Sequence, residues 1–98
     1  MPDQYVCGPT FTLAVADSSV GFLSTSLSPT TNDYKMEQAI IQAVGALYIE
    51  TGGGAATTSS FPMAAGDSIS ITGYGNLKNL RFIRNTNTTS VVVIPLYR

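Results

Sequence analysis

Few of the 98 residues are of the types that carry acid–base, nucleophilic or metal chemistry. Histidine is absent, which excludes a Ser-His-Asp triad and a Cys-His pair and removes the commonest metal ligand of proteins. The carboxylates lack the spacing of a calcium-binding loop and are scattered as Asp3, Asp17, Asp33, Glu37, Glu50 and Asp67. We therefore expect no enzyme, no metal site and no cofactor. A glycosidase pair formed in space by two carboxylates is an alternative that no spacing predicts.

Two glycine-rich segments, five tyrosines and one cysteine are the other candidates for ligand chemistry. Residues 52–54 and 73–75 lack the lysine and hydroxyl residue that complete a phosphate-binding loop, so we interpret them as turns. Tyr48 and Tyr74 are candidates for a glycan platform, because an aromatic face binds a sugar ring without charge. The single cysteine, Cys7, excludes an intrachain disulfide. We expect it to be a small buried or half-buried hydrophobe, with an interchain bridge or a reactive thiol as the alternative.

The charge of the chain is low and unevenly distributed. Charged residues make up 11% of the sequence and the formal net charge is −1, so there is no basic excess to neutralise phosphates and we expect no nucleic-acid partner. Residues 1–67 contain all the acidic residues, whereas four of the five basic residues lie in residues 68–98. This pattern indicates pairing between the two halves, with binding of an acidic partner by Arg81 and Arg84 as the functional alternative.

Nothing in the sequence predicts a membrane segment or a secretory signal. Residues 1–6 contain Asp3 and no cation, unlike the positively charged start of a signal peptide. The most apolar window, residues 38–49, is interrupted by Gln42 and Gly45 and is shorter than the roughly twenty residues that span a bilayer. We therefore expect no membrane partner.

Alternation of apolar and polar residues predicts a series of short strands. Residues 36–50 fit either one helix or two strands, and we favour strands because a glycine such as Gly45 costs about 1 kcal/mol inside a helix. Residues 17–35 are expected to be a long loop or covering arm with one short strand, and residues 51–60, 65–67 and 73–76 to be loops and turns. The predicted strands are residues 10–16, 38–44, 46–50, 68–72, 80–84 and 90–97.

The last predicted strand is apolar on both faces, with residues 92, 94 and 96 on one side and residues 91, 93 and 97 on the other. In a thin domain only one face meets the core, so the other is expected to be covered by a further element of the chain or by a neighbouring subunit. The candidate interface residues are Arg81, Ile83, Arg84, Val91, Val93 and Tyr97.

These elements predict an all-β domain over residues 1–98, of which residues 1–35 include the possible arm or loop. About seven short strands without alternating helices favour an antiparallel β-sandwich or a small barrel of the jelly-roll type.

From Met36 onward, about two thirds of the chain resembles small virion proteins of tailed bacteriophages. The shared features are a strand ending in residues 45–49, a Gly-Thr-Ser loop and the Pro-x-x-Ala-Gly-Asp turn of residues 62–67. They continue with the Asn-Leu-x-Asn-Leu-x-Phe-Ile pattern of residues 76–83 and a valine-rich last strand that closes with Tyr97. These segments look like those of jelly-roll-like capsid accessory modules.

The resemblance implies a capsid cement or decoration protein that is made in the host cytoplasm and lies on the capsid exterior. Such a protein would assemble as a homotrimer or similar ring and bridge subunits of the major capsid protein. A head-to-tail connector or tail component is the alternative within virions, and a carbohydrate-binding host-attachment module is the alternative from another class.

Overall fold

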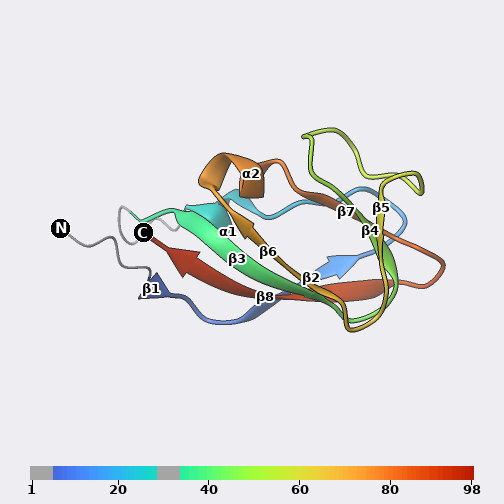
Figure 1. Cartoon of the computed structure of the whole chain (residues 1–98), viewed down its shortest axis with the longest axis horizontal. Helices are drawn as coiled ribbons and strands as arrows, with labels where there is room; N and C mark the ends of the chain where they lie inside the picture. Colours follow the sequence, from blue (N-terminus) through green and yellow to red (C-terminus); the bar gives the residue numbers. More distant parts are fainter. Residues whose placement is uncertain (1–5, 29–33) are drawn as a thin grey trace.

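The computed structural model describes residues 6–28 and 34–98 and shows an all-β, sandwich-like fold, as predicted. Two antiparallel sheets pack against each other, and two short helices close the end of the molecule at which the last strand finishes (Figure 1). The strands are β1 (Val6–Cys7), β2 (Phe11–Val15), β3 (Met36–Ala43), β4 (Leu47–Glu50), β5 (Phe61–Met63), β6 (Ser68–Thr72), β7 (Arg81–Arg84) and β8 (Thr89–Tyr97), and the helices are α1 (Ser24–Leu27) and α2 (Tyr74–Lys78).

The larger sheet is built around β8. Strand β3 pairs with β8 along one side and β6 extends the sheet beyond β3, while β1 and β2 both pair with the other side of β8. In the register of this sheet, Val93 lies opposite Phe11 on one side and Ile41 on the other. Residues directly opposite each other in an antiparallel pair point to the same face, so these side chains share the inner face.

The smaller sheet has the order β5-β4-β7 and covers the inner face of the larger one. Its strand β4 directs Leu47 and Ile49 inward, and both are buried. Val20 pairs with the edge of β7 that faces away from β4. Its N–H donates to the Phe82 carbonyl at 2.9 Å, and the Phe82 N–H donates to the Val20 carbonyl at 2.7 Å. In the described part of residues 17–35, this isolated bridge stands where a short strand is expected.

Gly45 separates β3 from β4, which confirms the two-strand interpretation of residues 36–50. A Cβ at this position would lie 2.6 Å from the Thr89 hydroxyl oxygen, too close for any side chain without movement of its neighbour. Glycine avoids this contact where the chain passes from one sheet to the other beside the start of β8.

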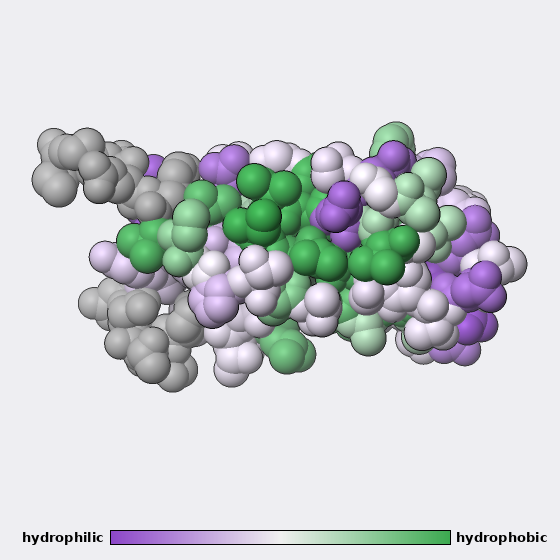
Figure 2. Space-filling model, turned by 90° about the horizontal axis from the view of Figure 1, so that it is seen from below, coloured by the Kyte–Doolittle hydropathy of each residue, from purple (hydrophilic) through white to green (hydrophobic). Residues whose placement is uncertain are grey.

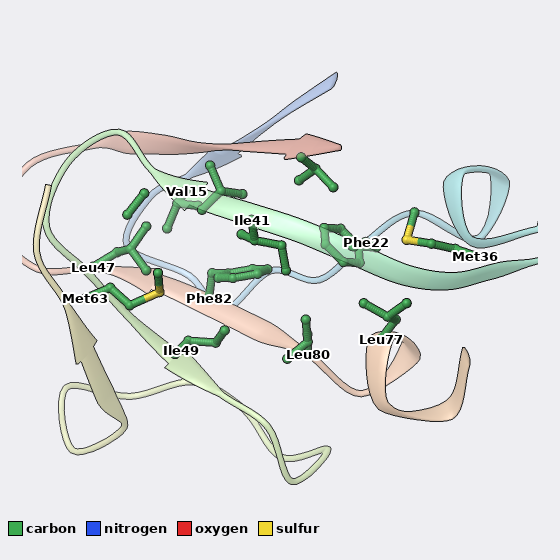
Figure 3. Packing of buried hydrophobic residues seen from close by; sticks show 14 of the residues in the cluster. Val15, Phe22, Met36, Ile41, Leu47, Ile49, Met63, Leu77, Leu80 and Phe82 are labelled. Carbon is green, nitrogen blue, oxygen red and sulfur yellow. The ribbon is translucent and has the colours of Figure 1, made fainter. Parts of the chain in front are cut away.

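The core lies between the two sheets and is entirely apolar among the described residues. Phe82 is its central aromatic residue, with its ring centroid 5.9 Å from that of Phe22 (Figure 3). The ring centroids of Phe22 and Phe11 lie 6.0 Å apart. Met36 and Leu77 close the end of the core beneath the two helices, and both side chains are fully buried (Figure 3).

Both helices depart from the expected structure. Residues 17–35 contain α1, and residues 29–33 lie outside the described part, so the prediction of an arm is tested only in part. The segment 73–76, expected as a turn, begins α2, in which Leu77 is buried. A helix of five residues is little more than one turn, so it shows no helical periodicity, and burial of Leu77 in the core stabilises it.

The turn before β6 has the predicted chemistry. Gly66 adopts φ of 89°, and the Asp67 carboxylate accepts a hydrogen bond from the Ala64 N–H at 2.9 Å. Gly66→Ala is expected to lower the free energy of unfolding by about 1 kcal/mol, because left-handed backbone is unfavourable for residues with a Cβ. A Cβ at Gly66 meets nothing within 4 Å, so the loss isolates the backbone effect.

The matched control is Gly75→Ala, since a Cβ at Gly75 also meets nothing within 4 Å but the residue lies in α2 with negative φ. This change is expected to be neutral or to stabilise by up to about 1 kcal/mol through helix propensity. Urea unfolding of both variants measures the difference. Equal effects of the two substitutions would contradict the assignment of the Gly66 turn.

Candidate functional site

The described residues contain no cluster of three or more His, Cys, Asp or Glu side chains that could hold a metal ion. No helix in residues 6–28 and 34–98 has the length and apolarity to cross a bilayer. Cys7 is exposed, which corrects the expectation of a buried or half-buried hydrophobe. Exposed surfaces and hollows are the remaining places where the described residues could form a site.

The prediction that Val91 and Val93 lie at an interface is wrong. Both side chains have no exposed area, because they point into the core between the sheets. A side chain without exposed area has no surface to offer to another chain. The opposite face of β8, which carries Val92, Ile94 and Leu96, is the one that meets solvent.

This outer face of the larger sheet carries an apolar strip. Ile94 of β8 lies opposite Ile40 of β3, and their side chains are 40% and 41% exposed. Val44, which directly follows β3, is 55% exposed. Figure 2 shows apolar side chains gathered along the middle of this face of the molecule. The residues of the outer-face strip are Ile40, Val44, Val92, Ile94 and Leu96.

Neutral polar side chains border the outer-face strip. Gln38 donates to the Ser70 hydroxyl at 3.1 Å, and Gln42 donates to the Gly66 carbonyl at 3.4 Å, so both amides are directed sideways toward β6 and the turn before it. The outward positions that the register defines in β2, β3, β6 and β8 include no charged residue. Apolar side chains with an uncharged border are typical of the central part of a protein–protein interface.

The structure places Arg81 and Arg84 on different faces of the smaller sheet. Arg81 lies opposite Glu50, whereas Arg84 lies opposite the inward-facing Leu47. The Arg81 guanidinium donates to the Leu80 carbonyl at 2.9 Å and to that of Lys78 at 3.2 Å. The Arg84 guanidinium donates to the Thr88 hydroxyl at 3.2 Å. The two arginines therefore do not form one bidentate site for an acidic partner.

Ile83 and Tyr48 lie opposite each other on the outer face of the smaller sheet, and both are half-buried. Tyr74 begins α2, and the Lys35 ammonium lies 5.4 Å from the centre of its ring. Figure 1 shows α2 and β4 in different parts of the molecule, so Tyr48 and Tyr74 do not form a shared glycan platform.

Tyr97 points inward at the end of β8 and is used by the fold itself. Its hydroxyl donates to the Ser26 carbonyl at 2.8 Å, which ties the last strand to α1. Together with Cys7, Phe11 and Tyr34 it lines an open hollow of about 480 Å³. The described lining of this hollow has no charged side chain.

Burial raises the pKa of the Tyr97 hydroxyl above its ordinary value of 10.0. Below pH 10.0 the Tyr97 hydroxyl keeps its proton in both the folded and the unfolded chain, so the stabilisation from its raised pKa is fully present. As pH rises above 10.0 the unfolded chain loses this proton first, so the free energy of unfolding falls. Tyr97→Phe is expected to cost about 0.5–1.5 kcal/mol at neutral pH, through loss of the hydrogen bond, and to reduce the alkaline decline. Urea unfolding of both proteins at several pH values measures this. Parallel pH profiles would contradict it.

Sequence reasoning missed the outer-face strip because it assigned the interface to the face of the last strand that is buried in the core. The sequence signal for the exposed face lies in β3. Its inward positions, Ala39 and Ile41, are both apolar, whereas its outward positions alternate Ile40 with two glutamines. In the observed register of β3 with β8, Ile94 lies opposite Ile40 and so shares this outward face.

No protein-family model matches the chain, and neither the curated proteins nor the solved structures give a significant match.

Proposed function

We propose that this chain is a non-enzymatic structural protein of a virion, a capsid decoration protein that binds the lattice of the major capsid protein and stabilises the head. The observation that carries the proposal is the outer-face strip, which leaves Ile40, Val44 and Ile94 about half exposed without a charged residue among them. The sequence resemblance to jelly-roll-like capsid accessory modules supplies the class of partner.

The outer face fits a lattice partner for a physical reason. An apolar sheet face gains free energy when a flat protein surface removes it from water, at roughly 25 cal/mol per Å² of apolar area. The neutral border formed by Gln38, Gln42 and Ser70 adds hydrogen-bonding groups without desolvating a charge.

Cryo-electron microscopy of particles from the virus that encodes the chain tests the proposal. A decoration protein is expected over the whole shell, with the outer face of the larger sheet against the capsid subunits. Density at a single vertex would identify a head-to-tail connector, and density on the tail a tail component or an attachment module; either result would overturn the proposal.

A further inference from the structure

Strand β6 forms a free edge of the larger sheet, since it pairs only with β3 among the described strands. At one end of this ladder the Ala43 N–H donates to the Asp67 carbonyl, and at the other the Gly73 N–H donates to the Glu37 carbonyl. Hydrogen-bonded positions alternate along an antiparallel strand, so residues 69 and 71 also bond to β3. The N–H and C=O groups of Ser68, Ser70 and Thr72 therefore point away from the sheet.

The strand at this edge lacks two of the features that usually protect a sheet edge. The five residues of β6 include no charge and no proline. In contrast, β5 contains Pro62, the free side of β7 is bridged by Val20, and the opposite edge of the larger sheet is divided between β1 and β2 on either side of Pro9. An open hollow of about 270 Å³ runs beside β6 and includes Ser70, Thr72 and Asn76 in its lining.

We propose that β6 pairs with β6 of a second copy of this chain, antiparallel and about a twofold axis at Ser70. In this register Ser70 lies opposite Ser70 of the second copy and Ser68 lies opposite Thr72. The N–H and C=O groups of these residues are those that point away from β3, so each finds a partner across the axis. The Thr72 carbonyl already accepts a hydrogen bond from the Asn76 side-chain amide at 2.9 Å. A carbonyl oxygen has two lone pairs, so it can also accept the Ser68 N–H of the second copy.

The residues of β6 make a second copy the fitting occupant, because the sequence Ser-Ile-Ser-Ile-Thr is self-complementary in this register. On the inner face Ile69 would lie opposite Ile71 of the second copy, at positions without hydrogen bonds, where side chains approach most closely. Both isoleucines are half-buried in one copy, and pairing removes more of their area from water. The neighbouring Asp67 would lie opposite Gly73, so no like charges meet.

The pairing joins two larger sheets edge to edge and places their two outer-face strips side by side. Two linked strips bind a repeated lattice more tightly than one, because the second contact forms intramolecularly. The contact gives a twofold pair rather than the trimer implied by the sequence resemblance. It does not depend on the proposed function, since it concerns the purified protein alone.

Cysteine crosslinking tests the register in a Cys7→Ser background. Ser70→Cys is expected to form a covalent dimer under mild oxidation. Ser68→Cys is the matched control, since two copies of position 68 would be about 14 Å apart, four residues along the strand. A mixture of Ser68→Cys with Thr72→Cys is expected to form a crosslinked heterodimer. The proposal would be overturned if Ser68→Cys by itself crosslinked as well as Ser70→Cys by itself, or if neither variant crosslinked.

Sedimentation equilibrium gives an independent readout without cysteines. The unchanged protein is expected to be a dimer, and Ser70→Lys a monomer with an unchanged far-UV circular dichroism spectrum, because two ammonium groups would meet at the axis. Thr12 lies in β2, at the opposite edge of the same sheet. Thr12→Lys is therefore expected to remain a dimer. A monomeric or trimeric unchanged protein, or dissociation by Thr12→Lys instead of Ser70→Lys, would refute the pairing.

Discussion

Phe82→Ala is expected to lower the free energy of unfolding by about 3–5 kcal/mol. The Phe82 side chain has no exposed area and fills the space between the two sheets, where it contacts the ring of Phe22. Alanine would leave a cavity, because the backbone hydrogen bonds of residue 82 with Val20 and the pairing of β7 with β4 hold the surrounding strands in place. Domains of this size are stable by only about 5–15 kcal/mol, so the variant is expected to lose a large share of its stability.

Ile83→Ala is the matched control for Phe82→Ala. Ile83 is the next residue of β7, but it points to the outer face of the smaller sheet and is half-buried. Its loss is expected to cost at most about 1–2 kcal/mol, since solvent and neighbouring side chains fill the space. Urea unfolding monitored by circular dichroism measures both variants. A smaller loss for Phe82→Ala than for Ile83→Ala would show that the core is not centred on Phe82.

Most strands of the fold could be predicted because their signal is local. In residues 68–72 the two isoleucines alternate with hydroxyl side chains, and the structure places Ile69 and Ile71 on the inner face. Helix α2 could not be predicted, because its five residues include Gly75 and contain only one side chain, that of Leu77, that is buried. Its stability comes from tertiary contact, which leaves no periodic pattern in the sequence.

The candidate surface depended on long-range pairing and was therefore predicted less well. The sequence of β8 is apolar on both faces, so its own period does not distinguish Val93, which is buried, from Ile94, which is exposed. The distinction comes from the register with β3, in which Ile41 lies opposite Val93 and Ile40 opposite Ile94. That register joins segments about fifty residues apart, and composition does not encode it.

Ile94→Asp is expected to leave the isolated protein folded and to abolish its attachment to the capsid. In the free protein the side chain is 40% exposed, so the carboxylate stays hydrated and the free energy of unfolding is expected to fall by only about 1–2 kcal/mol. In the attached protein the carboxylate would be buried against an apolar surface without a partner. The expected loss of affinity is at least about 100-fold, the equivalent of about 2.7 kcal/mol.

Phe61→Asp is the matched control for Ile94→Asp, because Phe61 is a more exposed apolar residue, at 66%, but lies on β5 of the smaller sheet. Adding each purified variant to particles that lack the chain and measuring the bound protein by sedimentation compares them directly. Binding is expected to persist for Phe61→Asp and to be lost for Ile94→Asp. The reverse result would move the contact to the smaller sheet, and full binding of both variants would show that the outer-face strip does not contact the capsid.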